Sequence, residues 1–169
     1  MHTFQPYPIE LLDMNPFTKI GKDWALLTAG SKKKCNTMTV SWGGLGVLWG
    51  TPSATIYIRP QRYTREFIEK NELFTISFFK SEYKKILSFC GSHSGRDCDK
   101  AKETGLTPIE IDGTTSFEEA ELILVCRKKY SQNMTADSFL DKSLLEKWYP
   151  NNDLHTVYIG EIITAYQND

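Results

Sequence analysis

The sequence lacks the motifs of the common hydrolases and metalloenzymes. It has only three histidines, His2, His93 and His155. It contains neither a G-x-S-x-G nucleophile elbow nor an H-E-x-x-H zinc motif. The segment from Gly91 to Gly95 places a serine on each side of His93, but neighbouring Ser and His residues in a loop are typical of a polar turn. Nucleophilic hydrolysis is therefore disfavoured.

Cysteine pairs are also missing. The four cysteines, Cys35, Cys90, Cys98 and Cys126, form no C-x-x-C spacing, which argues against a zinc site. Cys90 and Cys126 fall in apolar stretches, and we expect them to be small buried hydrophobic residues. Cys35 directly precedes a polar strand segment, where a redox-sensitive thiol is an open alternative.

The chain has no excess charge of either sign and no long apolar run. Twenty basic and 21 acidic residues give a net charge of −1, whereas nucleic-acid-binding proteins usually carry a clear excess of Lys and Arg. No window approaches the roughly 18 apolar residues of a membrane-spanning helix. Residues 1–20 contain three prolines and two acidic residues in place of a signal peptide. We expect a cytoplasmic protein with neither a nucleic-acid nor a membrane partner.

Standard nucleotide-binding motifs are absent as well. Gly43, Gly44 and Gly46 follow a predicted strand, but no amphipathic helix and no acidic ribose partner come after them. A P-loop lysine pattern is also missing. A nucleotide bound by this chain is therefore held by another geometry.

Hydrophobic patterning predicts a mostly-β protein, a β-barrel with peripheral helices that forms one domain over residues 1–169. Strands outnumber helices, and the two do not alternate in the rhythm of βαβ units. Strands are expected at 24–29, 36–42, 54–59, 73–79, 120–127 and 154–166. Helices are expected from Thr64, from Ser81 to Gly91, from Ser94 to Gly105, and from Ser143 to Pro150, with Ser81 and Ser94 as N-caps.

Two basic segments favour an anion site. Arg59 and Arg62 lie between a predicted strand and the helix that begins at Thr64, whose first N–H groups are unpaired. Guanidinium groups near such a terminus suit a phosphate. Ser94-Gly95-Arg96, with Lys100, forms a second group that is able to meet the same anion. The alternative is a solvated face beside a capped helix.

The predicted strand 36–42 has a hydroxyl-bearing side. Thr37, Thr39 and Ser41 alternate with Met38 and Val40. A flat aromatic ligand lying along a strand edge needs such hydroxyl and backbone groups. An ordinary amphipathic strand has the same pattern.

Taken in order, four segments resemble the flavin reductase-like family, and its flavoredoxin-type branch in particular. They are Asn36-Thr37-Met38-Thr39-Val40-Ser41-Trp42-Gly43, Arg59-Pro60-Gln61-Arg62-Tyr63-Thr64, Ser94-Gly95-Arg96-Asp97 with Lys100, and Asp153-Leu154-His155 with Gly160-Glu161-Ile162. Each segment is weak by itself, but the ordered set, which extends from residue 36 to 162, is quite specific.

The resemblance implies an FMN-binding split β-barrel that forms a homodimer. It implies that the isoalloxazine ring is lined by Asn36, Thr37, Met38 and Thr39, with Ser41 and Trp42 close by. It implies that the phosphate end is held by Arg59, Arg62, Tyr63 and Thr64, and the ribityl-phosphate region by Ser94, Gly95 and Lys100. His155 resembles the family histidine that faces the flavin or nicotinamide side of the pocket.

Three functions are compatible with this resemblance. The first is an oxidoreductase that takes a hydride from NADH or NADPH and passes electrons to free flavin or to a redox partner protein. The second is an FMN electron carrier that a partner protein reduces. The third is a flavin-binding module without turnover. A bound flavin supplies the redox chemistry itself, which agrees with the absence of a catalytic triad or metal cluster.

Overall fold

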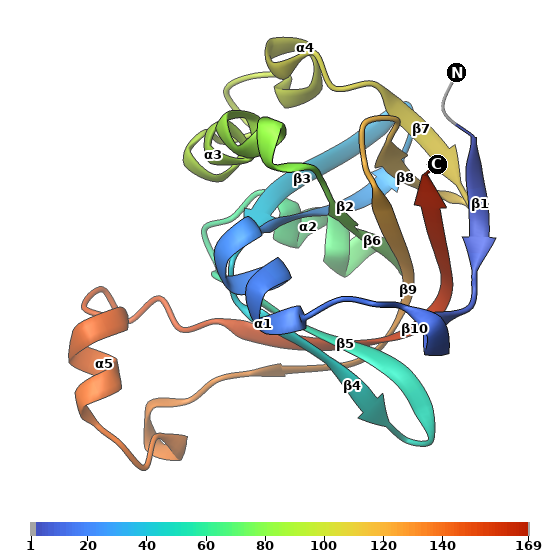
Figure 1. The fold of residues 1–169 in the computed structure, drawn as a ribbon. Helices are drawn as coiled ribbons and strands as arrows, with labels where there is room; N and C mark the ends of the chain where they lie inside the picture. The colour runs from blue at the N-terminus through green and yellow to red at the C-terminus, as the bar shows by residue number, and fades with distance from the viewer. Residues whose placement is uncertain (1–2, 169) are drawn as a thin grey trace.

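The computed structural model describes residues 3–168, which form a strongly curved antiparallel sheet with helices at its periphery (Figure 1). The sheet has eight strands in the order β3-β2-β6-β9-β10-β5-β4, with β1 paired to β10. Its strands are β1 (Phe4–Tyr7), β2 (Ala25–Ser31), β3 (Lys34–Val40), β4 (Gly43–Leu48), β5 (Thr51–Ile58), β6 (Leu73–Phe78), β9 (Leu122–Asn133) and β10 (Thr156–Asn168). Strands β7 (Pro108–Ile111) and β8 (Thr114–Phe117) form a separate hairpin. The predicted mostly-β fold with peripheral helices is confirmed.

The helices are short and lie outside the sheet. They are α1 (Pro16–Thr18), α2 (Thr64–Lys70), α3 (Lys84–Ser92), α4 (Lys100–Thr104) and α5 (Ser143–Trp148). A π-helix, Lys19–Asp23, follows α1 directly. No helix within the described part of the chain has the length and apolar character needed to cross a membrane. Residues 3–168 also contain no group of three or more His, Cys, Asp or Glu side chains able to hold a metal ion.

The central strands are buried on both faces, which explains their continuous apolar sequence. In β2, Leu27 and Ala29 point into the larger core with Phe74 and Tyr158. Leu26 points the other way, into a second core that α3 and the β7–β8 hairpin cover. Alternate residues of one strand thus serve different cores, as the two-residue period of a strand requires.

The first residues of β4 and β10 both pair with the last part of β5, and several predicted site residues lie at these strand ends. Thr156, the first residue of β10, pairs with Ile58 near the end of β5, so His155 and Arg59 lie at neighbouring ends. Gly43, the first residue of β4, pairs with Ile56, so Trp42 lies close to Tyr57. Strands β9 and β10 carry the α5 segment, residues 134–155, away from the barrel (Figure 1). The sheet register therefore brings residues 42, 57, 59 and 155 together.

Several expected elements were confirmed, and some boundaries were wrong. The strands expected at 24–29, 36–42, 54–59, 73–79, 120–127 and 154–166 correspond to β2, β3, β5, β6, β9 and β10. Ser81 is not a helix cap, since a 3-10 helix precedes α3, and Ser94 is not one either, since α4 begins only at Lys100. The side chain of Asp99 caps α4 by accepting from Lys102 N, and Gly105 ends that helix at a φ of 77° as expected.

Candidate functional site

Except for the buried Thr37, the predicted site residues line two neighbouring cavities that β3 connects. The basic cavity, about 190 Å³ in volume, is lined by Asn36, Gln61, Arg62, Tyr63, Thr64, Ser92, His93, Ser94, Gly95 and Lys100. The aromatic cavity, about 250 Å³, is lined by Met38, Thr39, Val40, Ser41, Trp42, Tyr57, Arg59, Trp148 and His155. Residues that are distant in sequence therefore meet in two groups, one at each end of β3.

A close backbone approach builds the basic cavity. Asn36 in β3 donates from Nδ2 to Thr64 Oγ1 at 2.8 Å, which joins the strand to the first residue of α2. A Cβ at Gly95 would lie 1.9 Å from Asn36 Oδ1 and 3.2 Å from the Tyr63 ring, so only glycine fits without displacing a neighbour. The loop at Gly95 therefore packs directly against Asn36.

Arg62 carries an unsatisfied donor in this cavity. Its Nη1 donates to the Gly91 carbonyl at 2.8 Å, whereas its Nη2 is buried and has no hydrogen-bond partner among residues 3–168. Burial lowers the pKa of Arg62 from its usual value. A buried donor without an acceptor is rare and costs about 1–3 kcal/mol. A ligand oxygen would remove this cost.

Lys100 adds a second buried cation. Its Nζ donates to the carbonyls of Thr37 (2.8 Å) and Cys90 (2.7 Å), and the residue is 5% exposed. Burial, and then the charge of Arg62, lower the pKa of Lys100 to about 8. In the described chain, neither Lys100 nor Arg62 has a carboxylate within ion-pair distance. The cavity therefore has uncompensated positive charge.

The remaining residues of the 94–96 loop make local contacts. Ser94 Oγ accepts from Arg96 N at 3.2 Å. Arg96 lies over the Tyr63 ring, 4.6 Å from its centroid, and pairs with Glu66. Arg96 is thus engaged at the rim, whereas Arg62 and Lys100 are the cations inside.

The strand between the cavities uses its hydroxyls within the protein. Thr37 is 3% exposed, and its Oγ1 lies 2.8 Å from Thr28 Oγ1 and donates to Leu27 O at 3.2 Å. Thr39 donates to the carbonyl of Leu87 in α3. Met38 packs into the larger core. Ser41 lies beyond the end of β3 and is exposed.

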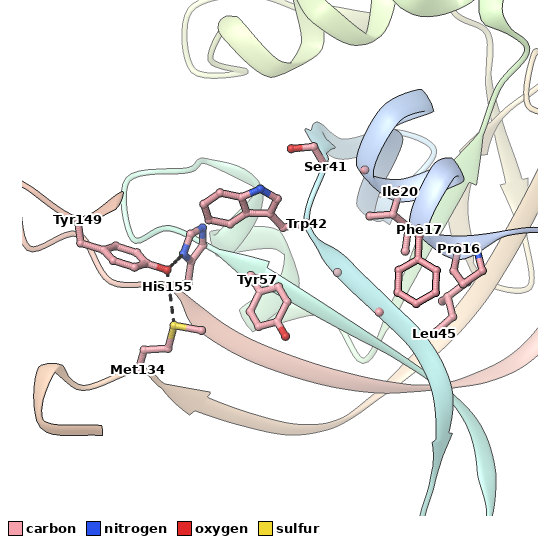
Figure 2. A pocket seen from close by; sticks show the side chains of 13 residues that line it. Pro16, Phe17, Ile20, Ser41, Trp42, Leu45, Tyr57, Met134, Tyr149 and His155 are labelled. Atoms are coloured by element: carbon pink, nitrogen blue, oxygen red, sulfur yellow. Dashed lines mark hydrogen bonds between the residues drawn. The ribbon is translucent and has the colours of Figure 1, made fainter. Parts of the chain in front are cut away.

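Aromatic side chains from separate segments form the other cavity. Trp42 meets Trp148 edge to face, with ring centroids 5.0 Å apart, and lies 5.5 Å from the His155 ring. Tyr57 completes this wall. An outer cavity of about 520 Å³ adjoins it and shares Ser41, Trp42, Tyr57 and His155. Figure 2 shows Trp42, Tyr57 and His155 on one side of this outer cavity and Phe17 and Leu45 across from them.

Arg59 lies with the α5 segment and not beside Arg62. Its Nη1 is 2.9 Å from Asp153 Oδ1, and its Nη2 donates to Trp148 O at 2.9 Å. The structure therefore places one of the two predicted arginines in each cavity.

His155 is buried and uncharged at neutral pH. The residue is 7% exposed, and its Nδ1 lies 2.7 Å from the Tyr149 hydroxyl (Figure 2). Burial, and then the charge of Arg59, lower its pKa to about 4, although Asp153 acts in the opposite direction. Sequence reasoning missed Tyr57, Trp148 and Tyr149, because only the sheet register and the α5 segment bring them to His155.

Comparisons with known proteins show which family and which solved structures this chain is similar to. Residues 17–169 match the model of the "Flavin reductase like domain" family. A flavoredoxin from Methanosarcina acetivorans is 26% identical over 86% of this chain and 68% of its own, with a TM-score of 0.66. The FMN-binding domain of a flavin reductase-like enzyme from Shewanella baltica is 18% identical over 99% and 78%, with a TM-score of 0.69.

An NADH:FAD oxidoreductase from Streptomyces globisporus, solved in complex with NAD and FAD fragments, has the same fold. It is 16% identical over 87% of this chain and 77% of its own, with a TM-score of 0.63. No curated protein matches the chain.

Proposed function

The chain belongs to the flavin reductase-like family. We therefore propose that it is an oxidoreductase, that residues 1–169 form a single domain, and that this domain binds FMN along β3. The phosphate occupies the basic cavity, and the isoalloxazine ring occupies the aromatic cavity. The flavoredoxin and the FMN-binding neighbours support FMN as the ligand.

The unpaired Arg62 Nη2 is the observation that carries this assignment. A phosphate there would accept from Nη2 and from Lys100 Nζ, and would place negative charge between two cations that otherwise repel one another. Thr64, Ser94 and Gly95 line the same cavity. The residues present therefore fit a phosphate group.

The separation of the cavities suits an elongated ligand. Asn36 lines the basic cavity and Ser41 the aromatic one, and five residue steps of a strand span about 17 Å. Trp42 and His155 offer an aromatic wall and a neutral imidazole at the ring end. A ligand with an anionic end and a flat uncharged end is thereby bound in one orientation.

A bound flavin supplies hydride and electron chemistry, and the chain's own residues bind it, orient it and exclude water. We propose NADH or NADPH as the electron donor, with free flavin or a partner protein as the acceptor. The outer cavity, which adjoins Trp42 and His155, offers space for such a donor, and the Streptomyces enzyme supports the assignment.

An electron carrier reduced by a partner protein is the second candidate. The flavoredoxin from Methanosarcina acetivorans, 26% identical to this chain, favours it. We also propose a homodimer in the cytoplasm. The exposed Val47 and Trp49 at the turn between β4 and β5 support self-association.

An absorption spectrum of the purified protein, with and without added FMN, tests the cofactor. Flavin bands retained through desalting support the proposal, and a protein that releases added FMN contradicts it.

Anaerobic mixing with NADH and NADPH then separates the candidate functions. Reduction of the bound flavin supports the first, and reduction only by a low-potential protein or chemical donor supports the carrier. Resistance to every donor indicates a binding module.

A further inference from the structure

The α5 segment brings a tyrosine to the histidine of the site. We propose that Tyr149 is a positioning residue that holds His155 in the neutral tautomer protonated on Nε2, so that the imidazole presents an N–H donor to the ligand cavities. The identity of the ligand that accepts a hydrogen bond from this donor rests on the proposed function. The tautomer itself is a property of the protein alone.

The hydroxyl of Tyr149 has two neighbours but one proton. Its oxygen lies 2.7 Å from His155 Nδ1, an ordinary hydrogen-bond length, and 3.7 Å from Met134 Sδ. An imidazole nitrogen is a much stronger acceptor than a thioether sulfur. The tyrosine therefore donates to Nδ1, which carries no proton, and the proton of the neutral ring is on Nε2.

Tyr149 is held firmly enough to impose this choice. It is 9% exposed, its N–H donates to Leu145 O at 2.9 Å, and the Arg59 guanidinium lies 4.8 Å from its ring centroid. Arg59 also binds Trp148 O and Asp153, on either side of Tyr149 in sequence. Gln61 Nε2 donates to Asp153 Oδ2 at 2.8 Å. Two residues that follow β5 thus hold the segment that carries the tyrosine.

The surroundings of His155 keep the ring neutral and leave Nε2 free. The titratable and charged groups near it are Tyr57 from β5, Arg59 just beyond that strand, Tyr149 directly after α5, and Asp153 from the following loop. Burial lowers its pKa to about 4. Within residues 3–168, Nε2 has no hydrogen-bond partner, and His155 lines both the aromatic and the outer cavity. An N–H donor at this position suits a neutral carbonyl oxygen.

Nitrogen-15 NMR of the histidine rings in the flavin-free protein tests the tautomer directly, with His155→Gln used to assign the signal. We expect a protonated Nε2 and an unprotonated Nδ1 in the wild type. Tyr149→Phe, which removes only the hydroxyl, should convert this single tautomer into a mixture. Tyr57→Phe, a matched loss of a nearby hydroxyl that has no hydrogen bond to His155, should leave the tautomer unchanged.

Met134→Leu distinguishes the two possible directions of the hydrogen bond. If Tyr149 donates to Nδ1, loss of the sulfur leaves the tautomer unchanged. If Nδ1–H donates to the tyrosine, which then donates to Met134, the variant changes the His155 signals. A wild-type ring protonated on Nδ1, or a Tyr149→Phe ring that keeps the wild-type tautomer, would overturn the inference.

Flavin kinetics give a second readout that a merely structural role would not produce. Tyr149→Phe should bind FMN with unchanged affinity but show a several-fold lower rate of flavin reduction by the nicotinamide. Equal rates in the two proteins would contradict the inference. A wild-type protein that no nicotinamide reduces would instead contradict the proposed donor, and the NMR result would still decide the tautomer.

Discussion

Burial has different consequences for the charge of the side chains in the basic cavity and in the aromatic cavity. Burial lowers the pKa of Arg62 and Lys100 in one cavity and of His155 in the other. The pKa of Lys100 falls only to about 8, whereas the pKa of His155 falls to about 4. Because the two side chains begin from different pKa values, Lys100 remains largely charged at neutral pH and His155 does not. Desolvation thus leaves a cationic lysine at one end of the site and an uncharged histidine at the other, where Arg59 is neutralised by Asp153.

The largest expected effect tests the uncharged end. His155 has a folded pKa of about 4, against about 6.5 when unfolded, so the unfolded state binds the extra proton between these values. We expect the free energy of unfolding to fall by about 2 kcal/mol from pH 7 to pH 5 through this residue. Urea denaturation of the wild type and His155→Gln at both pH values measures this contribution.

The exposed His93 provides the control for this experiment. His93→Gln should keep the wild-type loss of stability at pH 5, whereas His155→Gln should lack the part that His155 contributes. An identical pH dependence in His155→Gln and the wild type would show that the ring is not held neutral by the fold.

The next effect tests the cationic end. Arg62→Ala removes a charge-assisted contact to the phosphate and should weaken FMN binding more than tenfold, about 1.4 kcal/mol or more. Fluorescence titration measures the affinity. Arg65→Ala, a nearby arginine in α2 that pairs with Glu69, is the matched control. Unchanged FMN affinity in Arg62→Ala would remove Arg62 from the site.

Riboflavin, which lacks the phosphate, sharpens this test. Its affinity should be similar in Arg62→Ala and in the wild type, because the guanidinium would have no phosphate to contact. A parallel loss for both ligands would mean that the substitution distorts the ring end as well.

The smallest effect concerns Lys100. In the free protein this ammonium loses its proton as the pH rises through about 8, whereas a bound phosphate keeps it protonated. FMN affinity should therefore fall about threefold between pH 7.5 and 8.5. Titrations of the wild type and Lys100→Met across this range check the slope, which should be flatter in the variant. The same slope in both would exclude Lys100 as its source.

Much of this architecture was predictable from local patterns. Apolar and β-branched runs identified β2, β5, β6, β9 and β10, because a strand buried on both faces needs apolar residues on both. Strand β4 was missed because its glycines resemble a bend, and β1 because Pro6 lies within it. Ser81 and Ser94 were wrong as caps, since a suitable residue type does not by itself show where a helix begins.

The fold class, the family and the candidate site residues were predictable because they depend on residue types and their order. Which of these residues share a cavity follows from the way the folded chain brings distant segments together. Arg59 and Arg62 are three positions apart, yet one clamps the α5 segment and the other is buried beside Lys100. The partnership of Tyr149 with His155 likewise depends on the sheet register and the path of α5. Contacts between distant segments and the desolvation of individual groups arise only when the chain is folded.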